Sequence, residues 1–98
     1  MSAFLLQIEL QNILNNAIEA FTANEKHLQQ LFVEGKMYSY SISENHTNIW
    51  CVINAEDETE VMHLASKFPL QQYFTDVICC KLHSHTNLPI SFPVISLN

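Results

Sequence analysis

Three side chains in the first half of the chain are suited to proton transfer or to orienting a ligand. The imidazole of a histidine has an unperturbed pKa of about 6.5, so His27 can exchange protons near neutral pH. Tyr38 and Tyr40 are two residues apart, which places both phenol groups on one face of a strand. We predict His27 and Tyr40 as catalytic residues and Tyr38 as a ligand-binding residue. The alternatives are a solvated helix face for His27 and core packing for the tyrosines.

Trp50 is a further candidate for ligand binding. It lies in the apolar run of residues 49–53, where an indole ring can stack on a ligand or anchor the core or a dimer interface. The acidic residues between positions 56 and 60 offer carboxylates, but acids there also complement the dipole of a helix start. We predict Trp50 as a ligand-binding residue and the acidic group as a solvated helix start.

Two histidines near the end of the chain have a spacing that metal ligands use on a strand. His83 and His85 are two residues apart, and Cys79 falls on the same face. A zinc site needs three or four protein ligands, and no CxxC or HExxH spacing completes the set. The three cysteines, of which Cys79 and Cys80 are adjacent, do not form a disulfide framework. We therefore expect free thiols, no metal and no cofactor.

Composition and charge narrow the class of protein. The chain has 98 residues, which suits one domain, and 48% of them are hydrophobic. The formal net charge is −6, with four lysines and no arginine, so no basic surface is predicted for nucleic acid or for anionic membranes. No apolar run approaches the roughly 18 residues that span a membrane, and residues 1–10 lack the pattern of a secretory signal. We expect a cytoplasmic protein.

Four segments have the hydrophobic pattern of β-strands. Residues 36–43 alternate with a period of two, and residues 48–54 form a mostly apolar run. The polar residues 44–47 between them predict an antiparallel hairpin. The other two predicted strands are residues 3–10 and 75–82.

A long segment has the periodicity of an amphipathic helix. Apolar residues return every three or four positions across residues 12–34, and Gly35 follows where a left-handed helix cap forms easily. Thr22 and Glu25 have the spacing of a capping box, so a break of this helix near Ala23 stays open.

A second helix is predicted behind Asp57, which has a capping-box partner in Glu60. Its apolar stripe ends before Pro69. Residues 84–98 contain two prolines and do not suit a central strand. We therefore divide the chain into a domain of residues 1–83 and a C-terminal extension of residues 84–98, whose apolar side chains favour packing on the domain or on a partner subunit.

The order of these elements predicts an α+β domain of ferredoxin-like βαββαβ topology, with a four-stranded antiparallel sheet and two helices on one face. The other face of the sheet also carries apolar side chains. Pairing two sheets face to face would bury them, which predicts a homodimer of the α+β barrel type or a higher oligomer. A monomer whose own tail covers the sheet is the alternative.

The segment of residues 31–82 resembles the muconolactone isomerase family of dimeric α+β barrels. The resemblance rests on the end of the first helix, the strand around Trp50, the acidic helix start and the proline-bearing run before the last strand. These matches are residues 34–36, 48–50, 57–60 and 68–73. They are fold-building positions, so the resemblance implies the dimeric barrel architecture more than a particular chemistry.

Enzymes of that family move a proton within an unsaturated lactone that carries a carboxylate. The resemblance therefore implies an isomerase that acts on a small organic acid or lactone. In the family, the stretch after the first helix is rich in arginine, whereas here it contains Lys36 and no arginine. Lysine offers a point charge instead of a bidentate clamp, which makes Lys36 a ligand-binding candidate and argues against the family's own lactone.

Two hypotheses remain open. The first is a small-molecule isomerase that acts by proton transfer through His27 and Tyr40, with Tyr38, Lys36 and Trp50 binding the ligand. It requires an enclosed, partly polar pocket that gathers His27, Tyr38 and Tyr40. The second is a non-catalytic small-ligand-binding or assembly module with the same fold.

Overall fold

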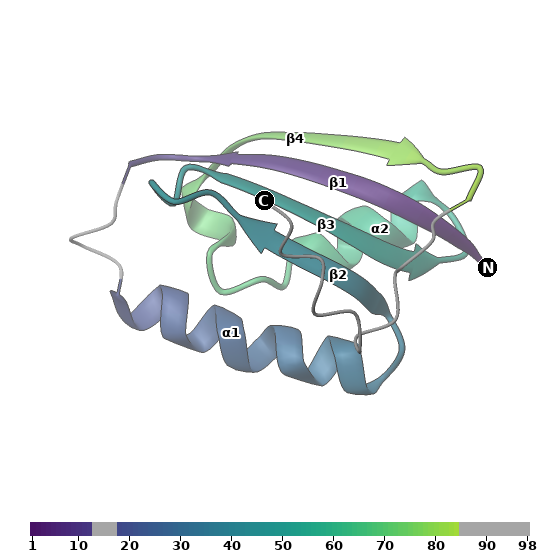
Figure 1. Cartoon of the computed structure of the whole chain (residues 1–98), viewed down its shortest axis with the longest axis horizontal. Coiled ribbons are helices and arrows are strands. Elements are labelled where there is room, and N and C mark those ends of the chain that lie inside the picture. Colours follow the sequence, from purple (N-terminus) through teal and green to yellow (C-terminus); the bar gives the residue numbers. More distant parts are fainter. Residues whose placement is uncertain (13–17, 85–98) are drawn as a thin grey trace, which may run out of the picture.

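A computed structural model describes residues 1–12 and 18–84 of the chain. These residues form one layer of β-sheet and one layer of helices (Figure 1). In chain order the elements are β1 (Ser2–Leu10), α1 (Ile18–Val33), β2 (Met37–Ile42), β3 (Asn48–Ala55), α2 (Glu58–Ala65), the 3₁₀ turn η1 (Gln71–Tyr73) and β4 (Phe74–Lys81). This order confirms the βαββαβ topology predicted from the sequence.

The four strands form an antiparallel sheet in the order β2-β3-β1-β4. Both helices lie on the same face of this sheet, where α1 packs against β2 and α2 packs against β3 and β4 (Figure 1). The opposite face has no helix within the described residues. The ferredoxin-like α+β fold is therefore confirmed.

The core lies between the sheet and the two helices. In the central strands β1 and β3, every second residue faces the helices and is buried, with an exposed fraction of 5% or less. Each such burial stabilises the fold by about 1.5–3 kcal/mol for a large aliphatic side chain. The core residues of β1 and β3 are Phe4, Leu6, Ile8, Leu10, Ile49, Cys51, Ile53 and Ala55, and those of the helices are Leu28, Leu31, Val61 and Ala65.

Helix α1 runs without a break through Ala23. Thr22 lies inside the helix, where its hydroxyl donates to the carbonyl oxygen of Ile18 at 3.1 Å. The alternative of a capping box and a break at this point is therefore wrong, because the threonine hydroxyl bonds back along a continuous helix. Residues 13–17, which the sequence also assigned to this helix, lie outside the described residues.

The end of α1 is set by Gly35, whose φ of 74° lies in the left-handed region. The Gly35 N–H donates to the carbonyl of Phe32 at 3.1 Å, and the Lys36 N–H donates to the carbonyl of Leu31 at 2.9 Å. This pair of bonds is a Schellman cap, which glycine adopts without the strain that a Cβ adds. The cap predicted at Gly35 is confirmed, and it turns the chain directly into β2.

The capping box predicted for α2 is also confirmed. The N–H of Glu60 donates to Asp57 Oδ1 at 2.9 Å, and Glu60 Oε1 accepts from the N–H of Glu56 at 2.7 Å. One free N–H group of the first helical turn is thereby satisfied, and the second bond holds the residue that precedes the cap. The helix ends at Ala65, ahead of Pro69 as expected.

Strand β2 contains a bulge that the alternating sequence pattern did not reveal. Met37 pairs with Ile53 and Ser39 pairs with Val52, so β2 has one residue more than β3 between these pairs. An extra residue reverses the alternation of side chains beyond it. The period-two pattern of residues 36–43 places Met37 on the side opposite Tyr40. This expectation is wrong, because the bulge leaves Met37 buried on the same face as Tyr40.

The described residues include no helix with the length and apolar character that a membrane crossing requires. They end at Ser84, so the predicted C-terminal extension of residues 84–98 lies almost wholly outside them. The division of the chain into residues 1–83 and this extension stays a prediction.

Candidate functional site

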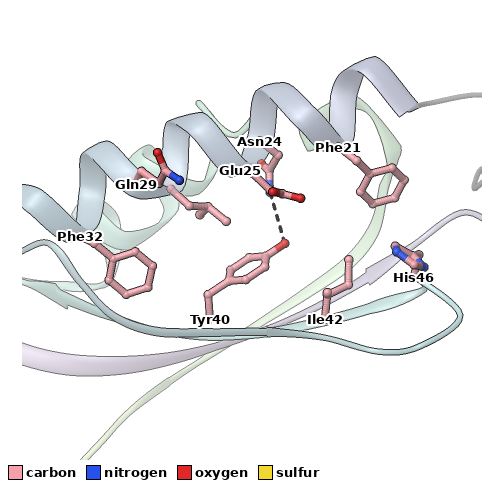
Figure 2. A pocket seen from close by; sticks show the side chains of 9 residues that line it. Phe21, Asn24, Glu25, Gln29, Phe32, Tyr40, Ile42 and His46 are labelled. Atoms are coloured by element: carbon pink, nitrogen blue, oxygen red, sulfur yellow. Dashed lines mark hydrogen bonds between the residues drawn. The ribbon is translucent and has the colours of Figure 1, made fainter. Parts of the chain in front are cut away.

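A pocket of about 340 Å³ lies between α1 and β2 (Figure 2). One stripe of α1 forms the first wall, and β2 with the turn to β3 forms the second. The three- and four-residue spacing along α1 and the two-residue spacing along β2 place these side chains on facing surfaces. The lining residues are Phe21, Asn24, Glu25, Leu28, Gln29 and Phe32 from α1, and Tyr40, Ile42 and His46 from the second wall.

A buried polar contact joins the two walls of the pocket. The Asn24 side chain is 2% exposed, and its Nδ2 donates to the hydroxyl oxygen of Tyr40 at 3.2 Å, drawn as the dashed line in Figure 2. Asn24 Oδ1 is buried and has no hydrogen-bond partner among the described residues. Leaving such an acceptor unpaired costs about 1–3 kcal/mol, so this buried oxygen lacks a donor that its burial calls for.

The Tyr40 phenol is held in its neutral form. Burial raises the pKa of Tyr40 well above its usual value of about 10. The neighbouring Cys51 and Glu25 raise this pKa further, because a negative charge on either group repels a phenolate, while the hydrogen bond from Asn24 acts in the opposite direction. Near neutral pH Tyr40 therefore offers a ligand a hydrogen-bond donor and does not act as a base.

His46 offers the pocket a basic nitrogen. It lies in the β2–β3 turn with a φ of 61°, and its Nδ1 is 3.0 Å from the carbonyl oxygen of Glu44. A carbonyl oxygen only accepts, so this hydrogen bond places a proton on Nδ1 and leaves Nε2 unprotonated in the neutral ring. The ring meets Phe21 edge to face, with the ring centroids 5.2 Å apart.

Side-chain hydrogen bonds hold the turn that carries His46. Asn45 Oδ1 accepts from the hydroxyl groups of Ser43 and Thr47, each at 2.7 Å. Ser43 Oγ accepts in turn from the N–H groups of Thr47 at 3.1 Å and Asn48 at 3.0 Å. Such local bonds fix a turn without help from the core, so the position of His46 is built into this segment.

The charge of the pocket is negative when His46 is neutral. Glu25 contributes a carboxylate, and no lysine is among the lining residues that the structure describes. Lys36, which the sequence suggested as a ligand-binding residue, instead lies with its Nζ 3.6 Å from a carboxylate oxygen of Glu34. Both of these side chains are exposed, so their pairing contributes little to stability.

The pocket does not gather all the residues that the sequence suggested. Tyr40 lines it, whereas Tyr38 is 43% exposed and outside the lining. His27 also lies outside the lining, because the helical repeat turns it toward Phe68, with the ring centroids 5.8 Å apart. Trp50 pairs with Gln7 on the sheet face opposite the helices. The expected convergence of His27, Tyr38 and Tyr40 is not observed.

Two residues of the site were missed from the sequence. Asn24 interrupts the apolar stripe of α1 between Phe21 and Leu28, and a polar residue at a core position is the signal that could have identified it. His46 was assigned only to a turn. Its contact with Phe21 joins segments far apart in the chain, and a local sequence pattern does not predict such a contact.

The cysteines and histidines of the described residues form neither a reactive thiol site nor a metal site. Burial raises the pKa of the Cys51 thiol to about 12, which keeps it protonated and unreactive. Burial and the nearby Glu58 also raise the pKa of Cys79. Within residues 1–12 and 18–84, no three histidine, cysteine or acidic side chains are placed to hold a metal ion. His85, one of the predicted pair, lies outside these residues.

Comparisons with known proteins support the fold. No protein-family model and no curated protein matches the chain. The chain is similar to the solved structure of 5-chloro-2-hydroxyhydroquinone dehydrochlorinase from Burkholderia phenoliruptrix AC1100, in complex with 2,5-dihydroxybenzoquinone. The TM-score is 0.71 and the identity 17%, over 85% of this chain and 95% of that chain. A second similar structure, the C-terminal domain of MgtC from Mycobacterium tuberculosis, has a TM-score of 0.47 and 11% identity, over 89% of this chain and 95% of that chain.

The raised pKa of Tyr40 predicts a loss of stability in alkaline solution. The phenol ionises more readily in the unfolded chain, so its contribution is fully present below about pH 10 and is lost as the pH rises from there toward the folded pKa. We expect the free energy of unfolding, measured with urea, to fall between about pH 9 and about pH 11. This fall should be smaller for Tyr40→Phe than for the unchanged chain. The difference should be at most about 1 kcal/mol, because the side chain is only half-buried.

Cys51 also titrates in both proteins, and it is electrostatically coupled to Tyr40, so the difference between the two losses reports on the Tyr40 phenol together with its repulsion of the Cys51 thiolate. Identical losses of unfolding free energy in the two proteins would contradict the placement of a neutral, half-buried Tyr40 phenol.

Proposed function

We propose that the pocket between α1 and β2 binds a small ring-containing molecule and that the chain moves a proton on it, as an isomerase does. The observation that carries this proposal is that the hydrogen-bonded pair of Asn24 and Tyr40 and the His46 side chain all line one pocket. The rest of the lining is largely apolar. A few polar groups set in an apolar concave wall are typical of a small-molecule site.

In this proposal His46 is the general base. Its Nε2 takes a proton from a carbon next to a carbonyl group, and the C–H electron pair forms a C=C bond as the carbonyl oxygen becomes an enolate oxygen. The Tyr40 phenol donates a hydrogen bond to that oxygen, and Asn24 holds the phenol in place. The imidazolium then returns the proton to another carbon of the conjugated system, so the double bond has moved and no atom is gained or lost.

Two similarities support a small-molecule role. The chain resembles the muconolactone isomerases at fold-building positions, and the structurally similar dehydrochlorinase was solved with a small quinone bound. The carboxylated lactone of the isomerase family fits this pocket poorly, because Glu25 lines the pocket and Lys36 does not. The proposal is therefore an isomerase with a different substrate.

A non-catalytic ligand-binding module is the second candidate. The described lining contains no lysine, and an enolate is usually stabilised by a cation as well as by hydrogen bonds. The same pocket would then bind its ligand without turnover.

Deuterium exchange separates the two candidates. The unchanged protein should transfer deuterium from D₂O into at least one member of a panel of small enolisable cyclic ketones and lactones, followed by proton NMR. His46→Gln should slow this exchange by about 10²–10⁴-fold because the base is lost. His63→Gln, which changes an exposed histidine on α2, is the matched control and should leave the rate unchanged.

His27→Gln decides between the two candidate histidines. Loss of exchange in this variant, with exchange retained in His46→Gln, would overturn the assignment of His46 as the base. Binding of panel members by the unchanged protein, with no exchange above the buffer rate, would favour the non-catalytic module.

We further propose that a second copy of the chain covers the sheet face opposite the helices. Trp50 on β3 and Ile78 on β4 lie on this face and are 37% and 53% exposed. Both pair with Gln7 of β1, so the two exposed apolar side chains lie on either side of an exposed glutamine on this face. Face-to-face packing of two such sheets about a two-fold axis buries this surface on both copies.

Light scattering after size exclusion tests this pairing. The unchanged chain should have the mass of a dimer, and Trp50→Glu should shift it to a monomer because a carboxylate cannot be buried there unpaired. Met62→Glu is the matched control, since Met62 is an apolar residue of α2 with a similar exposed fraction of 40%. It should leave the dimer intact. A monomeric mass for the unchanged chain would refute the pairing.

A further inference from the structure

We propose that the ligand of this pocket is a neutral ring compound with a hydroxyl group that bonds to the Asn24–Tyr40 pair, and that Glu25 disfavours carboxylates. This inference rests on the proposed function, because it names the ligand class of the same pocket. It follows from the hydrogen-bonding capacity, the size and the charge of the described lining.

The Asn24–Tyr40 pair has at least one donor and at least one acceptor to spare. The bond from Nδ2 to the phenol oxygen leaves Asn24 Oδ1 unpaired and does not use the hydroxyl proton of Tyr40. With the amide turned over, Tyr40 donates to the amide oxygen, and the groups to spare become an amide N–H and the phenol oxygen. Both orientations of the amide therefore leave at least one donor and at least one acceptor.

A hydroxyl group matches this pair because it donates one hydrogen bond and accepts another. A methyl ether accepts only, so it satisfies the donor of the pair and leaves the acceptor unpaired. Leaving a buried acceptor unpaired corresponds to about a tenfold loss of affinity. A water molecule satisfies the same two groups, and it is the occupant against which the hydroxyl compound has to be tested.

The size of the pocket suits one or two rings. Its volume is about 340 Å³, and an apolar cavity of about 150 Å³ is large enough to bind benzene. Phe21, Leu28, Phe32 and Ile42 give the pocket apolar surfaces that a water molecule does not fill. A ring placed against these side chains brings its hydroxyl to the polar pair.

The charge of the lining disfavours anions. Glu25 lies on the α1 wall together with Asn24, and its carboxylate is near enough to act on the charge state of Tyr40 (Figure 2). No lysine among the described lining residues offsets it. A carboxylate ligand would therefore meet a like charge while losing its hydration.

Three probes of matched shape test the proposal by calorimetric titration of the full chain. They are 4-ethylphenol, 4-ethylanisole and 4-ethylbenzoate. The unchanged chain should bind the phenol about tenfold more tightly than the methyl ether, and the benzoate most weakly. In Asn24→Leu, which replaces the amide by an apolar group of similar size, the phenol and the ether should bind alike. Asn24→Ala removes the same amide with a smaller side chain, and it should give the same loss of preference if Asn24→Leu does not fold. Tyr40→Phe keeps the unpaired Asn24 Oδ1 and should keep the preference for the phenol.

Glu25→Gln should raise the affinity for 4-ethylbenzoate about threefold to tenfold relative to the affinity for 4-ethylphenol. Glu19→Gln is the matched control, because it makes the same change of charge on an exposed residue of α1 outside the pocket, and it should change neither affinity.

Equal affinities of the unchanged chain for the phenol and the ether would overturn the hydroxyl proposal and leave the proposed pocket standing. Tighter binding of the benzoate than of the phenol would overturn the role of Glu25. Binding of none of the three probes would overturn the proposed function together with this inference, and would indicate that water alone occupies the polar pair.

Discussion

The hydrogen bond from Asn24 to Tyr40 joins α1 to β2 where the apolar core gives way to the pocket. An amide that is 2% exposed has to be paired, and Tyr40 satisfies only part of its hydrogen-bonding capacity. The same burial keeps the Tyr40 phenol neutral. One contact therefore joins the two walls, leaves the phenol proton unused and leaves the amide oxygen unpaired.

Three short structural features place the rest of the pocket beside this contact. The left-handed Gly35 ends α1 and starts β2 beside it, so the two walls are neighbours in the chain. The bulge in β2 reverses the alternation, which buries Met37 and still points Tyr40 toward α1. The hydrogen-bonded turn after β2 then places His46 next to Phe21. Each of these features depends on few residues, and together they place Asn24, Tyr40 and His46 around one pocket.

The elements of the fold could be predicted because their signals are local. Hydrophobic periodicity identified the strands and helices, and Gly35 and Asp57 marked a helix end and a helix start. The bulge in β2 depends on pairing with β3, so no pattern within β2 shows it. The pocket depends on which residues of α1 meet which residues of β2 and its turn. Tyr40 could therefore be suggested from its strand. Only the structure shows that His46 lines the pocket and that His27 contacts Phe68 instead.

Amide NMR of the ¹⁵N-labelled chain during titration with 4-ethylphenol tests the ligand site most directly. A ligand between α1 and β2 should shift the side-chain amide signals of Asn24 and the backbone signals of Tyr40 and His46, and these shifts should saturate together. The signals of Trp50 and Ile78 on the opposite sheet face should move little. Saturable shifts confined to that opposite face, or no saturable shifts at all, would contradict a ligand site between α1 and β2.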